Sequence, residues 1–126
     1  MIRRSELAAL LLLAPLTACG PSLEPTFDAI ATEVLVPSCA FNSCHGGNVP
    51  QSGLDFRDAD AAWETLQEAP VDSTMPRITP GDPDNSLLYT TLLGAVDDVE
   101  QMPKGGALED WQIEGFRQWI ADGAER

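Results

Sequence analysis

Apolar side chains recur every three or four residues in four stretches of the chain, which is the spacing of one face of an α-helix. In the first stretch Phe27, Ile30 and Val34 share a face, and Pro37 is expected to end the helix because proline interrupts the hydrogen-bond ladder. The predicted helices begin near residues 27, 59, 83 and 109 and end before Pro37, Pro70, Gly94 and Gly123. No convincing strand pattern is present. The pattern therefore predicts an all-α domain of about four short helices joined by long loops rich in glycine and proline.

Residues typical of helix ends delimit the last two helices. Asp82 is a favourable cap and Pro83 a favourable first residue, while Gly94 is typical of the position just past a helix. Glu109 and Asp110 place negative charge at the start of the last helix, where the helix dipole favours it. We therefore expect one continuous third helix from Pro83 and a fourth that opens at Glu109.

Composition narrows the possible partners. The 126 residues fit one domain, and 7 basic against 20 acidic residues give a net charge of -13 with no basic stripe. Nucleic acids are thereby excluded as partners, because their binding requires a basic surface. An acidic surface instead favours a partner protein with a basic docking patch. Aromatic residues make up only 6% of the chain, which leaves room in the interior for a bound group.

The N-terminal segment is typical of an export signal. Arg3 and Arg4 precede an apolar run over 7–16 that is too short to span a bilayer. The sequence Leu16-Thr17-Ala18-Cys19 resembles the bacterial lipobox, which implies that Cys19 becomes the first mature residue and carries lipid. The alternative is an ordinary secretory signal followed by an unrelated cysteine. The predicted division is a lipoprotein signal peptide at 1–18, a lipidated tether at 19–25 and a folded domain at 26–126.

This signal predicts a place in the bacterial cell envelope. The mature chain would be anchored to a membrane through lipid and face the periplasm. Gly20 follows Cys19, whereas an Asp there would resemble the signal for inner-membrane retention in enteric bacteria, so the outer membrane is favoured. The envelope is oxidising, and two nearby thiols in it normally form a disulfide, a metal site or a cofactor attachment.

The segment from Cys39 to His45 carries the most specific chemistry. The only histidine of the chain directly follows Cys44, and four residues separate the two cysteines. In c-type haem attachment two thiols form thioethers with the porphyrin, and a histidine after the second cysteine binds the iron. The usual spacing has two residues between the cysteines, so here the loop must bulge by two residues.

Other uses of these cysteines remain open. Cys39 and Cys44 can instead form a small disulfide loop, which is the default for thiol pairs in exported proteins. A zinc site is disfavoured because four ligands are needed and no further histidine is present. A thioredoxin-like motif would need two intervening residues and a βαβ unit.

A low-spin haem needs a sixth ligand, and with one histidine the candidates are methionines. Met75 and Met102 both precede a proline, which holds each in an extended segment. Met102 is favoured because its loop precedes the last helix and can fold back across the haem face opposite His45. Met75 lies near Arg77, in a stretch that would equally suit the haem propionates with Arg77 as their counter-ion. If neither methionine binds, the candidates are water, Lys104 or a partner's ligand.

Together these features resemble a small monohaem c-type cytochrome of the His/Met type, over about residues 26–124. Several short motifs are similar to cytochrome-like lipoproteins of bacterial envelopes: Val36-Pro37-Ser38-Cys39, Cys44-His45-Gly46-Gly47, Gly53-Leu54-Asp55, Pro80-Gly81-Asp82-Pro83, Ser86-Leu87-Leu88-Tyr89 and Met102-Pro103. The resemblance implies a cytochrome c-like fold around one covalent haem c, attached through Cys39 and Cys44 and ligated by His45 and Met102. The chain lacks the usual segment whose proline carbonyl accepts the histidine Nδ1 proton, and Pro50 is the candidate substitute.

The function implied is one-electron transfer with no small organic substrate. Side-chain catalysis is not supported, because a triad is impossible once His45 binds iron and the carboxylates are scattered. Two alternatives of other classes remain: a haem-free, disulfide-stapled lipoprotein that acts as an interaction module, and a haem sensor or peroxidase with an open sixth position.

Overall fold

The structure, a computed structural model, describes residues 19–126, so the expected signal peptide lies outside the described residues. It contains four α-helices: α1 (Phe27–Ile30), α2 (Ala59–Leu66), α3 (Leu87–Leu93) and α4 (Asp110–Ala121). A π-helical stretch, η1 (Ala31–Cys39), continues α1, and two short 3-10 turns are η2 (Gln51–Gly53) and η3 (Pro83–Asn85). Over residues 19–126 the only β-type pairing is an isolated bridge between Val96 and Val99. The predicted all-α fold of about four short helices is confirmed.

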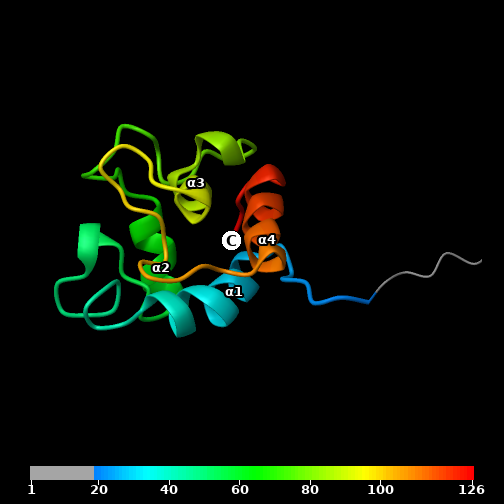
Figure 1. Cartoon of the computed structure of the whole chain (residues 1–126), viewed down its shortest axis with the longest axis horizontal. Helices are drawn as coiled ribbons and strands as arrows, with labels where there is room; N and C mark the ends of the chain where they lie inside the picture. The colour runs from blue at the N-terminus through cyan, green and yellow to red at the C-terminus, as the bar shows by residue number, and fades with distance from the viewer. Residues whose placement is uncertain (1–18) are drawn as a thin grey trace, which may run out of the picture.

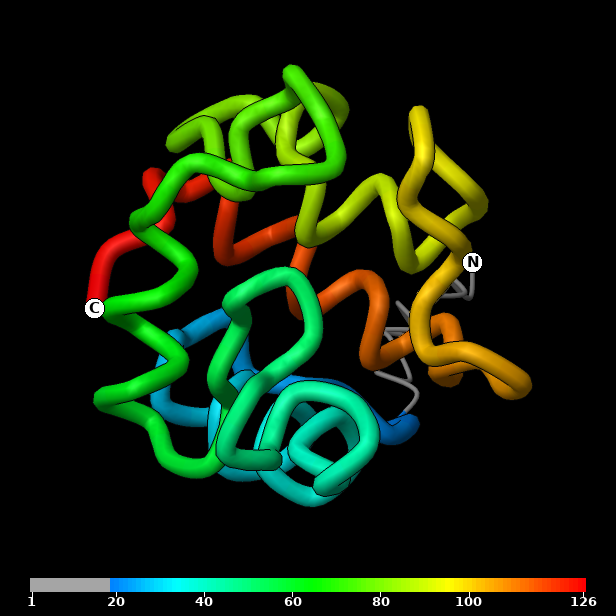
Figure 2. The backbone as a smooth tube through the Cα atoms, turned by 90° about the vertical axis from the view of Figure 1, so that its left-hand side faces the viewer, coloured from blue at the N-terminus to red at the C-terminus, as the bar shows by residue number. Residues whose placement is uncertain are grey.

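The helices surround the middle of the domain. Figure 1 shows α1 at the bottom, α4 at the right, α3 at the top and α2 at the left. Figure 2, turned by 90°, shows the yellow to orange segment that follows α3 descending along one side before it enters α4. Within residues 19–126 no helix is both long and apolar enough to cross a bilayer.

The first helical segment continues past Pro37, where the sequence had predicted its end. Proline disrupts an α-helix because its ring collides with the carbonyl four residues earlier and because it lacks an N–H. In the π-helical geometry of η1 each turn holds an additional residue, which shifts the carbonyl away from that ring. The helical path therefore continues to Cys39, and this cysteine lies at the end of a segment whose earlier residues are buried in the core.

The predicted third helix is divided in two, so the expectation of one continuous helix is wrong. Ser86 is fully buried and extended (φ -116°, ψ 116°), and it separates η3 from α3. Its Oγ accepts a hydrogen bond from Thr79 N and donates one to Asp82 O, both at 2.8 Å. Asp82 caps η3 through Asn85 N instead of capping α3. A buried hydroxyl with tertiary partners therefore overrides the local helical pattern.

The second helix ends at Leu66, three residues before the predicted end at Ala69. The carbonyl oxygen of Thr65 accepts a 2.6 Å hydrogen bond from the Arg77 guanidinium. Beyond Leu66 the chain closes with short bonds, from Gln67 N to Glu64 O and from Glu68 N to Thr65 O, both at 3.2 Å. The end of α2 is therefore set by a contact with a distant segment.

An aromatic cluster joins α1, α2 and α4. The ring of Phe27 lies 5.0 Å from that of Trp63 and 5.7 Å from that of Trp119, centroid to centroid. Leu23 belongs to the predicted tether but is 4% exposed and packs against Gly115 of α4, where an added Cβ would lie 2.6 Å from Leu23. Packing against the domain therefore begins within the tether.

Candidate functional site

The domain contains a cavity of about 330 Å³, and the predicted site residues lie together in its lining. Cys39, Cys44, His45 and Met102 all line it. Apolar side chains from η1, from the loop before α2 and from helices α2, α3 and α4 complete the wall, among them Leu35, Phe56, Leu66, Leu87, Leu92 and Phe116. An apolar cavity with a few convergent polar groups is the usual form of a cofactor site.

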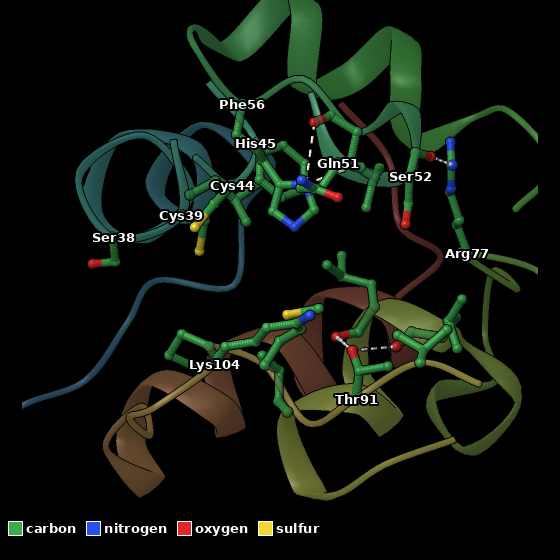
Figure 3. Close-up of a pocket in the computed structure, with 18 of the residues that line it drawn as sticks. Ser38, Cys39, Cys44, His45, Gln51, Ser52, Phe56, Arg77, Thr91 and Lys104 are labelled. Atoms are coloured by element: carbon green, nitrogen blue, oxygen red, sulfur yellow. Dashed lines mark hydrogen bonds between the residues drawn. The ribbon is translucent and has the colours of Figure 1, made fainter. Parts of the chain in front are cut away.

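The four residues between the cysteines fold into a compact turn. Cys44 N and Gly46 N donate to Phe41 O at 2.8 and 3.1 Å, and His45 N donates to Cys39 O at 3.2 Å. Gly46 is required here, because an added Cβ would lie 2.0 Å from the Ala40 carbonyl oxygen. The turn absorbs the two additional residues and brings Cys39, Cys44 and His45 to one side of the cavity (Figure 3).

The two thiols are unbridged in the structure. Cys39 and Cys44 are both free and half-buried. Burial raises the pKa of the Cys39 thiol to about 11, and the neighbouring Cys44 adds to this shift. Cys39 is therefore a neutral thiol at neutral pH, and this slows thiol–disulfide exchange, which needs the thiolate.

His45 is held from two directions and is only 8% exposed. Its Nδ1 lies 3.1 Å from Gln51 O and 3.2 Å from Leu54 O. Both partners are acceptors, so Nδ1 carries the proton and Nε2 keeps its lone pair for a ligand. Pro50, the candidate partner from the sequence, is not the acceptor, because the turn places the next carbonyl along the chain at Nδ1. Phe56 N donates to His45 O at 2.7 Å, so the backbone of His45 is also bonded to the 51–56 segment.

The surroundings of His45 favour the neutral ring. Burial lowers the pKa of His45, and the positive charges of Arg77 and Lys104 lower it further, while the two backbone hydrogen bonds oppose these effects. A neutral imidazole with a free Nε2 is the form that binds metals. We call this side of the cavity, formed by Cys39, Cys44, His45 and residues 51–56, the His45 wall.

The opposite side of the cavity comes from α3 and the loop that follows it. Figure 3 shows Thr91 and Lys104 across the cavity from His45. Met102 N donates to Thr91 O at 2.9 Å, which places the Met102 backbone on this side. We call Thr91, Leu92 and residues 102–104 the Met102 wall.

The structure separates the two candidate methionines. Met102 lines the cavity, whereas Met75 does not. The sulfur of Met75 instead accepts a 3.4 Å hydrogen bond from Thr90 Oγ1. The arrangement places Met102 on the cavity wall and gives Met75 a packing role beside α3.

Arg77 also lines the cavity and is 4% exposed. Its Nη1 donates to Thr65 O and its Nη2 to Ser52 O, both at 2.6 Å. Burial lowers the pKa of Arg77, and the nearby carboxylates of Glu68 and Asp72 oppose this. Among residues 19–126 no carboxylate forms an ion pair with it, unlike Lys104, which pairs with Glu100 at 3.2 Å. The predicted counter-ion thus stands on the cavity wall as a buried cation.

Sequence reasoning missed the residues that support this site. Thr65 Oγ1 accepts from Asp55 N at 3.1 Å, and Asp55 pairs with the Arg57 guanidinium at 2.6 to 2.9 Å. Both contacts hold the segment next to Leu54, which accepts from His45. A lone threonine on a helix face has no sequence signature for such a role; the short motif Gly53-Leu54-Asp55 was the only available signal.

The donors that face the cavity fit a haem. Two thiols and an imidazole Nε2 belong to one wall and a thioether sulfur to the other, within a mostly apolar lining. Over residues 19–126 no group of three or more His, Cys, Asp or Glu side chains could hold a bare metal ion. A flat apolar group with one iron suits these donors better than a hydrated cation does.

One comparison with known proteins bears on this site. The sequence model of the family described as Planctomycete cytochrome C matches residues 42–106, about half of the chain. The matched part includes Cys44, His45 and Met102 and begins after Cys39. No curated protein and no solved structure matches the chain.

Proposed function

Because the chain belongs to the planctomycete cytochrome C family, whose members are haem-based electron carriers, we propose that it carries one haem c, bound covalently, and transfers single electrons in the cell envelope. One observation carries the proposal: the fold gathers Cys39, Cys44 and His45 on one wall of an apolar cavity and Met102 on the other. The family indicates an electron carrier rather than an enzyme.

Cys39 and Cys44 are the attachment points in this proposal. Each contributes one sulfur to a thioether bond while the thiol hydrogen passes to a vinyl carbon, so attachment consumes no oxidant. The hydrogen-bonded turn between them fixes both thiols beside His45 before the group arrives. Preorganisation of this kind lowers the entropic cost of binding.

His45 and Met102 serve as the axial ligands. Bound between them, a haem supplies an iron that takes up and releases one electron. His45 offers Nε2 because its Nδ1–H is engaged by two carbonyls. Met102 offers a thioether, a soft neutral ligand that favours ferrous iron, and the buried site disfavours the additional charge of ferric iron. A raised reduction potential follows.

The test is covalent attachment in cells that contain a cytochrome c maturation system. We expect the purified protein to gain the mass of one haem and to stay coloured after denaturation, because thioether bonds survive unfolding. The α-band of its pyridine haemochrome should be that of a haem with two thioether bonds. An exported protein without haem and with a disulfide between Cys39 and Cys44 would refute the proposal and favour the disulfide-stapled module.

We further propose that lipid on Cys19 anchors the domain to the envelope, facing the periplasm, with the outer membrane favoured. Cys19 is exposed and free, and the described chain leads from it into the domain within a few residues. Cys19→Ser should convert a detergent-phase protein into a soluble or unprocessed one, since each buried CH₂ of a lipid contributes about 0.8 kcal/mol. A wild-type protein that is released without detergent would contradict the anchor.

The redox partner is proposed to present a basic patch. The net charge of -13 creates a long-range attraction for such a surface. The rate of electron transfer to this partner should therefore fall steeply as the ionic strength rises, which stopped-flow kinetics at several salt concentrations can measure. A rate independent of salt would contradict this partner.

A further inference from the structure

Arg77 connects the His45 wall to helix α2, which follows it in the chain. Its guanidinium donates to Ser52 O in η2 and to Thr65 O near the end of α2, each at 2.6 Å. The side chain is 4% exposed, so both bonds are shielded from water. The planar fork of arginine suits this bridge, because its two terminal nitrogens lie at fixed positions. Figure 3 shows Arg77 reaching Ser52 at the edge of the cavity.

The bridged turn is the one that orients His45. Ser52 lies between Gln51 and Leu54, whose carbonyl oxygens accept the Nδ1–H of His45. Ser52 has a φ of 55°, a left-handed conformation that is unfavourable for a residue with a Cβ. Contacts outside the turn must therefore hold it, and they come from Arg77 at the carbonyl and from Asp72 at the hydroxyl.

The other end of the bridge reaches the same segment. Thr65 accepts from Arg77 through its carbonyl oxygen and from Asp55 N through its hydroxyl, at 3.1 Å. Asp55 lies between Leu54 and Phe56, and both of these neighbours bond to His45. Arg77 thus holds residues 51–56 at both ends.

We propose that Arg77 is a positioning residue for the axial ligand: its two hydrogen bonds fix the 51–56 segment, and this segment fixes the orientation of the His45 ring. The inference rests on the proposed function, since His45 must bind iron for its orientation to matter. It differs from the role of a propionate counter-ion, which needs only the positive charge of Arg77. A buried cation with no ion-pair partner costs free energy that an apolar side chain would not, so the charged fork has a function beyond filling space.

The experiment compares three variants of the haem-loaded protein. Arg77→Met keeps the bulk but removes the charge and the fork, whereas Arg77→Lys keeps the charge and loses the fork. Arg117→Gln is the matched control, because Arg117 pairs with Glu114 on an exposed face of α4, away from the cavity. Three quantities are measured: hydrogen exchange of the Leu54 and Phe56 amides, the haem methyl shifts of the ferric protein, which report the plane of the histidine ring, and the reduction potential.

We expect Arg77→Met to accelerate exchange at Leu54 and Phe56 about tenfold or more and to redistribute the haem methyl shifts. Arg77→Lys should show the same two changes, while its potential stays closer to that of the wild type. Arg117→Gln should leave all three readouts unchanged. If Arg77→Met fails to fold, Arg77→Lys still decides the matter.

Wild-type exchange and methyl shifts in Arg77→Lys would overturn the inference and leave Arg77 as a counter-ion. Unchanged exchange and methyl shifts in Arg77→Met would overturn it as well. These results are distinguishable from failure of the proposed function, which would be visible earlier as a wild-type protein without covalent haem.

Discussion

The two walls of the cavity are built with very different numbers of constraints. On the His45 wall the ring, the backbone N–H and the backbone carbonyl of His45 each have a hydrogen-bond partner, and Gly46 fits against the Ala40 carbonyl with no space for a Cβ. On the Met102 wall the backbone of Met102 is held by one bond to Thr91, and just beyond this wall an added Cβ on Gly105 would meet nothing within 4 Å.

This difference separates two tasks of an electron carrier. The His45 wall holds Cys39, Cys44 and His45 in one hydrogen-bonded turn, so the proposed attachment and histidine ligation would depend on the fold itself. Residues 102–104 of the Met102 wall lie in a loop in which Met102 has one backbone bond to α3, and the proposed bond between iron and sulfur would be weaker than that to an imidazole. Changes on the first wall should therefore abolish the site, whereas changes on the second should tune it.

The largest effect is expected when both attachment thiols are removed. Cys39→Ala combined with Cys44→Ala should eliminate covalent haem, because no other thiol faces the cavity within residues 19–126. The measurement is the mass of the protein and its colour after denaturation. Cys19→Ala is the matched control: it removes an exposed cysteine outside the cavity and should leave haem attachment intact in the protein that is exported.

Next in size is the contrast between two glycines, one beside each wall. Gly46→Ala would place a Cβ 2.0 Å from the Ala40 carbonyl oxygen, so the turn between the cysteines must open. Gly106→Ala meets only the Pro103 side chain at 3.8 Å, an ordinary contact. We expect Gly46→Ala to lower the midpoint of thermal unfolding and the yield of haem, and Gly106→Ala to change neither. Similar results for the two variants would contradict the difference in constraint between the walls.

The sequence predicts those features of the structure whose causes lie within a few residues along the chain. The last helix begins as expected, because Glu109 and Gln112 form a capping box whose partners lie within three residues. The spacing of Cys39, Cys44 and His45 likewise predicts that these three residues lie together. Contacts between residues that are close in sequence can therefore be predicted from short motifs.

The missed features depend on side-chain contacts across irregular turns, which follow no regular spacing along the chain. Ser86 divides the third helix because its hydroxyl bonds to Thr79 and Asp82 across a turn. The acceptors of His45 lie six and nine residues away along an irregular loop, so the sequence suggests Pro50, whereas Gln51 and Leu54 accept the hydrogen bond in the structure. The spacing of apolar and polar residues does not reveal which side chain and which carbonyl will form a hydrogen bond across an irregular turn.

The third prediction tests the Met102 wall directly. Met102→Ala should remove the charge-transfer band between methionine sulfur and ferric iron in the near infrared and lower the reduction potential, while haem stays attached. Met75→Ala is the matched control, because Met75 does not line the cavity and its sulfur is engaged by Thr90. Loss of the band in Met75→Ala alone would transfer the ligand role to Met75, and absence of the band already in the wild-type protein would leave the sixth ligand to water, Lys104 or a partner.

The smallest effect concerns one ion pair beside each wall, and it depends on pH. The Arg57 guanidinium lowers the pKa of Asp55 below its ordinary value of about 3.8, mainly through hydrogen bonds to the carboxylate. A carboxyl whose pKa is lower in the folded protein stabilises that protein above the ordinary value and loses this contribution as the pH falls through the folded pKa. Asp55→Asn should therefore lower the unfolding midpoint at pH 7. It should match the wild type well below pH 3.8, where the Asp55 carboxyl of the wild type is protonated in both the folded and the unfolded protein.

Glu100→Gln is the control, because it removes the exposed pair with Lys104. It should change the midpoint less at pH 7, because both side chains are mostly in water. A difference for Asp55→Asn that persists in acid would assign its effect to packing instead of charge, and an equal effect of Glu100→Gln would mean that the two walls do not differ in how firmly their ion pairs hold them.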